Sequence, residues 1–103
     1  MGLTVVLELE GGESIATLED PSNALHRLLP SDAALYPSLA SIDWYGDTVF
    51  NRLQAERFLA EWERLAASAG PLSDEERRLV DGVHSLAERL AHELHVYLRF
   101  VGD

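Results

Sequence analysis

Apolar positions along this chain recur first at a spacing of two residues and then at a spacing near 3.6, and each change predicts a new element. Two short apolar runs, residues 3–10 and 13–18, lie on either side of Gly11-Gly12. Such runs joined by a Gly-Gly pair predict a β-hairpin. In the run L-E-L-E the leucines are expected to face the core and the glutamates the solvent.

Three later segments carry apolar residues at helical spacing. The first begins at Asp20-Pro21, an acceptor side chain followed by proline at the first helical position, and stops before a second proline. The second covers residues 51–69 and ends at Gly70-Pro71, with Arg57 and Glu61 spaced to pair on its polar side. Each segment predicts an amphipathic helix packed on a core.

The third helical segment has the clearest start signal. Ser73 and Glu76 form the pattern of a capping box, and the acids of the first turn suit the positive end of a helix. The segment runs to about Leu94, which makes an antiparallel pair with the preceding helix the expected arrangement. Gly82 inside it costs about 1 kcal/mol relative to alanine, a cost that the close approach of another backbone can offset.

Residues 95–101 return to alternation, with Val96, Leu98 and Phe100 on one side. The other side is not wholly polar, so this last strand is expected to be covered on both faces. The prediction is a single α+β domain over residues 1–103, in the order β-β-α-β-α-α-β. About four strands, the N-terminal hairpin and two more, are packed by three helices. If the third and fourth strands pair in parallel, the helical pair is their right-handed crossover.

The middle of the chain contains the change from strand to helix pattern. Residues 39–44 are interpreted as a short strand and Gly46 as a turn residue with positive φ. Asp47-Thr48 would then cap the helix that follows. A second capping pattern, N-x-x-Q, begins at Asn51.

The same stretch supplies the candidate binding surface, which comprises Asp43, Trp44, Tyr45, Asp47 and Phe50. Two interpretations stay open. Either Asp47 is only a helix cap, or the acids and Tyr45 meet at a strand end, where loops carry function. Aromatic side chains beside acids suit an anchor for a protein partner, although Trp44 and Phe50 fit the core equally well.

Composition limits the classes of function. The net charge is −10, cysteine is absent, and all eight basic residues are arginine. Disulfides, thiolate catalysis, lysine Schiff bases and phosphate-loop lysines are therefore excluded. No apolar run is long enough for a membrane span, and the N-terminus lacks the pattern of a secretory signal, so a cytoplasmic protein is expected. An acidic surface repels nucleic acid and anionic lipid and favours a basic protein partner, although solubility alone also explains it.

Candidate metal ligands are few. His84 and His92 lie two turns apart on one helix flank, and H-E-L-H is not the zinc pattern H-E-x-x-H. Asp43 and Asp47, with Asp103, could gather at strand ends and hold a hard cation. We expect no cofactor and no metal, and keep the aspartates as an alternative.

Two segments carry a resemblance to known proteins. I-D-W-Y-G-D-T-V-F-N-R-L-Q at residues 42–54 and V-Y-L-R-F-V-G-D at residues 96–103 resemble a family of small uncharacterised bacterial proteins of about this length. The likeness extends over nearly the whole chain, but only these segments are specific. The family has a proline where this chain has Trp44. The resemblance implies a bacterial protein and adds no catalytic residue.

Three hypotheses of function follow. The first is a small acidic protein-binding module, of accessory or immunity type, because no credible catalytic set is present. The second is a small metal-dependent hydrolase that uses Asp43 and Asp47. The third is a structural homodimer, joined through the helical pair or through the edge of the last strand.

Overall fold

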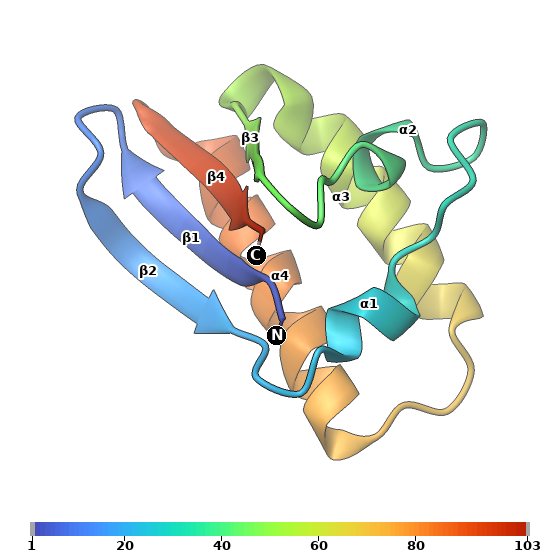
Figure 1. Ribbon diagram of the computed structural model, residues 1–103. Coiled ribbons are helices and arrows are strands. Elements are labelled where there is room, and N and C mark those ends of the chain that lie inside the picture. The colour runs from blue at the N-terminus through green and yellow to red at the C-terminus, as the bar shows by residue number, and fades with distance from the viewer. Residues whose placement is uncertain (1, 103) are drawn as a thin grey trace.

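The computed structural model describes residues 2–102, which form one four-stranded antiparallel sheet with the helices gathered on one side of it (Figure 1). The elements, in chain order, are β1 (Thr4–Leu9), β2 (Ser14–Glu19), α1 (Ala24–Leu28), α2 (Pro37–Ala40), β3 (Asp47–Phe50), α3 (Arg52–Ser68), α4 (Asp74–His92) and β4 (Val96–Val101). The predicted α+β class and order are confirmed. The short helix α2 is an addition to the three predicted helices.

The strand order is β2-β1-β4-β3, and every neighbouring pair is antiparallel. The last strand of the chain therefore lies inside the sheet, between the first strand and β3. Parallel pairing of the third and fourth strands is wrong. A homodimer through the edge of the last strand is also wrong, because β1 and β3 already occupy both edges of β4.

Local signals placed several element boundaries correctly. The hairpin forms on Gly11-Gly12, with an irregular register where β2 passes Leu7 and Glu8. Both halves of the capping box at Ser73 and Glu76 are present, at 2.9 and 3.1 Å. The expected helix start at Pro21 is wrong, because α1 begins at Ala24. Asp20 still caps it from a distance, since its carboxylate accepts the N–H groups of Ala24 and Leu25, each at 2.8 Å.

The central stretch differs from the prediction. Pro37–Ala40 is a helical turn, and the strand is Asp47–Phe50, so Asp47 and Thr48 extend β3 instead of capping a helix. The helix start is the second predicted pattern. The Asn51 side chain accepts from the Gln54 N–H at 3.1 Å, and the Gln54 side chain accepts from the Asn51 N–H at 2.8 Å. Alternation of Thr48 and Phe50 inward with Asp47 and Val49 outward was the signal for this strand.

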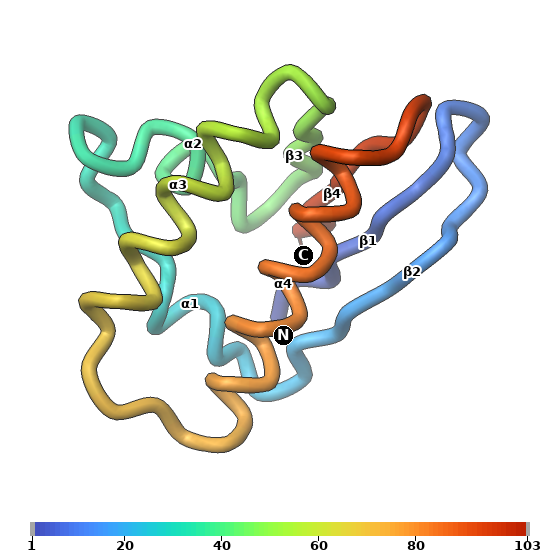
Figure 2. Tube along the Cα trace, turned by 180° about the vertical axis from the view of Figure 1, so that it is seen from behind, coloured from blue at the N-terminus to red at the C-terminus, as the bar shows by residue number. Residues whose placement is uncertain are grey.

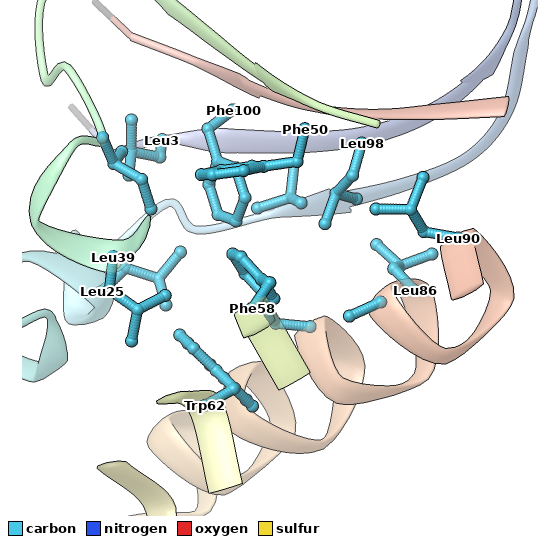
Figure 3. Packing of buried hydrophobic residues seen from close by; sticks show 14 of the residues in the cluster. Leu3, Leu25, Leu39, Phe50, Phe58, Trp62, Leu86, Leu90, Leu98 and Phe100 are labelled. Carbon is cyan, nitrogen blue, oxygen red and sulfur yellow. The ribbon is translucent and has the colours of Figure 1, made fainter. Parts of the chain in front are cut away.

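The core lies between the sheet and the helices (Figure 3). Phe58 of α3 is its centre, with ring centroids 5.0 Å from Phe50, 5.8 Å from Phe100 and 6.0 Å from Trp62. The Trp62 indole N–H donates to the Val80 carbonyl of α4 at 2.9 Å, so α3 and α4 are joined by a buried hydrogen bond as well as by packing.

Helix α4 packs on the helical side of β4 and β1 and is nearest the reader in the view from behind (Figure 2). Gly82 is the point of close approach to β2, since a Cβ there would lie 2.9 Å from a methyl carbon of Leu18. The close neighbour of this glycine is thus a side chain, and the expected approach of another backbone is wrong. Within the described residues, no helix is both long and apolar enough to cross a membrane.

Candidate binding surface

Residues 43–48, here called the Tyr45 turn, hold the most exposed aromatic ring of the described chain. Tyr45 is 86% exposed. The turn is fixed from within, because the Tyr45 N–H donates to Asp43 Oδ1 at 2.9 Å and the Asp43 N–H donates to Thr48 Oγ1 at 2.8 Å. The arrangement is an Asx-type turn that presents a ring between two exposed carboxylates, those of Asp43 and Asp47.

Gly46 shapes this turn, though not as predicted. It does not take the left-handed conformation, which among the described glycines belongs to Gly12 and Gly70. Its lack of a side chain matters because a Cβ would lie 2.8 Å from the Asp43 carboxylate. The Gly102 N–H also donates to the Gly46 carbonyl at 2.7 Å, which attaches the turn to the end of β4.

Two of the five predicted surface residues lie elsewhere. Phe50 is a core residue with 3% exposure, so its place on the candidate surface is wrong. Trp44 is half-buried and packs edge-on against His26, with ring centroids 4.7 Å apart. The alternation of β3 turns Phe50 inward, whereas Asp43, Tyr45 and Asp47 stay at the surface.

The side of the sheet away from the helices carries a second exposed surface. Val5, Leu98 and Phe100 point into the core, so their strand neighbours point the opposite way. We call this surface the open sheet face; it consists of Thr4, Val6, Glu8, Asp47, Val49, Tyr97, Arg99 and Val101. None of the helices within residues 2–102 covers it (Figure 1). The predicted cover on both faces of the last strand is therefore wrong.

Arg99 stands at the centre of the open sheet face and links three strands. Its guanidinium bonds Glu8 of β1 at 2.7 and 2.8 Å and Asp47 of β3 at 3.1 Å. The carboxylate of Glu8, and then that of Asp47, raise the pKa of Arg99 above its ordinary value. The cluster is sheltered from solvent mainly at Glu8, whose side chain is 12% exposed, against 33% for Arg99 and 49% for Asp47.

Sequence reasoning missed the open sheet face, although one signal was present. The second side of the last strand carries Tyr97, Arg99 and Val101, a mixture that suits neither full burial nor plain solvation. Only the strand order showed that Val6 and Val49 flank Arg99 on the same side.

The two aspartates of the hydrolase hypothesis are both engaged. Asp43 accepts from the backbone of its own turn, and Asp47 pairs with Arg99. Over residues 2–102 no group of three acidic or histidine side chains is arranged to hold a metal ion, and Asp103 lies outside the described residues. His84 instead contacts Glu63 at 3.1 Å and Glu88 at 3.4 Å.

The helical layer has an exposed apolar residue of its own. Leu53, in the first turn of α3, is 92% exposed and borders two shallow hollows of about 620 and 450 Å³. Both hollows are lined by Glu56 and by arginines of α3, so they mix charge with the leucine. Leu53 belongs to the helical layer and not to the open sheet face, so it provides a control position.

These features define the class of protein as a small α+β domain with one covered and one open sheet face. Comparisons with protein-family models, curated proteins and solved structures find no match to this chain. The resemblance of residues 42–54 and 96–103 to a bacterial family stays a prediction. The two segments do lie together, as β3 pairs with β4 along its length.

Proposed function

We propose that this protein is a small protein-binding module, of accessory or immunity type, that contacts its partner through the Tyr45 turn. The observation that carries the proposal is the 86% exposure of Tyr45 on a turn whose backbone is held by three hydrogen bonds. Tyrosine is enriched among residues that dominate binding energy. A turn that is already rigid loses little conformational freedom on binding.

The test is affinity capture from an extract of the organism that encodes the protein, with four baits. These are the wild type, Tyr45→Ser, Asp47→Asn and the control Leu53→Ser. We expect a partner retained by the wild type and by Leu53→Ser, and reduced about tenfold or more by Tyr45→Ser, as for an anchor residue. Circular dichroism checks that each bait is folded.

A partner lost with Leu53→Ser but kept by both turn variants would move the binding surface to the helical layer. Capture of nothing that depends on Tyr45 would refute the proposal. No observation favours the hydrolase or the homodimer strongly enough to propose either.

A further inference from the structure

We infer that the open sheet face docks a basic, partly apolar segment of another protein; the inference rests on the proposed protein-binding function and names its partner. An antiparallel sheet can have one solvated face, and such faces are normally polar. Here Val6, Val49, Tyr97 and Val101 surround a single ion cluster. Such a group of apolar side chains with a polar rim is typical of an interaction surface.

Charge decides the chemistry of the occupant. Seven of the eight arginines lie in the helices, and Arg99 is the one in a strand. The strands and the turns that join them carry the carboxylates Glu8, Glu10, Glu13, Glu19, Asp43 and Asp47. Arg99 is bonded to two of these and His95 contacts Glu10 at 2.9 Å, but acids still outnumber bases around the face, which attracts a cationic segment.

A hollow on the face suits a cationic side chain. It measures about 350 Å³ and lies between Tyr97, Val49, Arg99 and the hairpin turn, with Glu8 and Glu10 in its wall. A guanidinium can stack on a tyrosine ring while it bonds carboxylates. Glu8 is already bonded to Arg99, so the carboxylate that an incoming arginine reaches is that of Glu10, which also contacts His95 at 2.9 Å. The Tyr97 ring and the Glu10 carboxylate together favour arginine over a purely apolar side chain.

The edges of the sheet are less suited to binding a partner than the open sheet face is. At the β2 edge, Arg78 donates to the Glu19 carbonyl at 2.9 Å, and the strand register is irregular near Ser14. The other edge strand, β3, is only four residues long. Blocked and short edges discourage strand addition.

A second copy of this chain is a poor occupant. Two open sheet faces brought together would oppose their acidic rims, and like charges across an interface repel. The occupant to which the observations point is therefore another, basic protein.

The test is a titration of ¹⁵N-labelled full-length protein with a nona-arginine peptide, and with nona-glutamate as the sign control. We expect the largest amide shifts in β1, β3 and β4 around Val6, Val49 and Tyr97. The first turn of α4, Asp74–Glu76, serves as an internal reference, because it is also negatively charged but does not belong to the open sheet face. Shifts that are strongest there, or equal at both places, would overturn the inference.

A single and a double variant, each with a control, distinguish binding at the open sheet face from attraction by net charge. Tyr97→Ser leaves the charge unchanged, and we expect it to weaken nona-arginine binding about three- to tenfold, in the range of a cation–π contact, whereas Leu53→Ser leaves binding within about twofold. Glu8→Gln with Asp47→Asn should weaken binding more than the charge-matched control Glu56→Gln with Asp81→Asn. Equal losses in both double variants would show general acidic attraction and refute a specific site.

Sedimentation measures whether the protein forms a dimer. A wild-type dimer at micromolar concentration that Tyr97→Ser converts to a monomer would overturn the inference, because the occupant would be a second copy. The titration uses no cellular partner and leaves Tyr45 unchanged. Failure of the proposed function, the lack of a Tyr45-dependent partner, is therefore read separately from failure of this inference.

Discussion

At the scale of single residues, buried carboxylates position loops. Glu61 is 1% exposed on α3 and accepts the N–H groups of Ser38 and Leu39, at 2.9 to 3.1 Å. It does not pair with Arg57 at the surface, as its spacing suggested. The carboxylate satisfies the amides that open α2 and so holds the segment before the Tyr45 turn against α3.

Glu61→Gln should lower the free energy of unfolding by about 1–3 kcal/mol, since the amide keeps one acceptor oxygen and turns a donor toward backbone N–H groups. Urea denaturation measures the change. Glu56→Gln, on the exposed side of the same helix, is the matched control and should stay within about 0.5 kcal/mol. Equal effects at the two positions would contradict the capping role.

At the scale of elements, helix starts are set by local chemistry. Ser73 and Glu76 cap α4 reciprocally, and Asn51 and Gln54 do the same for α3. The backbone N–H of Ser73, and then its hydroxyl, lower the pKa of Glu76. Such pairs involve residues three apart, so they were predictable from the sequence.

The lowered pKa gives a dependence on pH with a definite sign. The folded-state pKa of Glu76 lies below its ordinary value of 4.5, so its stabilising contribution is present above that pH and is lost as the pH falls through the folded pKa. The stability difference between wild type and Glu76→Gln should therefore shrink from about pH 6 to about pH 3. Paired denaturation series measure it; a difference that grows toward low pH would contradict the cap.

At the scale of the whole molecule, the end of the chain completes the structure. β4 enters the middle of the sheet, and Gly102 then meets the Tyr45 turn. A Cβ at Gly102 would run into the Gly46 carbonyl and lie 2.7 Å from the Trp44 carbonyl oxygen. Backbone cannot move aside as a side-chain tip can, so this position requires glycine.

Gly102→Ala should destabilise the protein by about 1–3 kcal/mol through this overlap. Hydrogen exchange should locate the loosening in β3 and the Tyr45 turn. Gly11→Ala is the control, because no atom lies within 4 Å of a Cβ there, and its effect should be small. A neutral Gly102→Ala would show that the contact is not needed.

The sequence by itself determined the hairpin on Gly11-Gly12, the caps at Asn51 and Ser73, the amphipathic helices and the acidity, because each depends on neighbours within a few residues. Only the tertiary structure decided the strand order, the burial of Phe50 and the open face around Arg99. These depend on which distant strands pair, and alternation within one strand gives two faces without saying which one the helices cover.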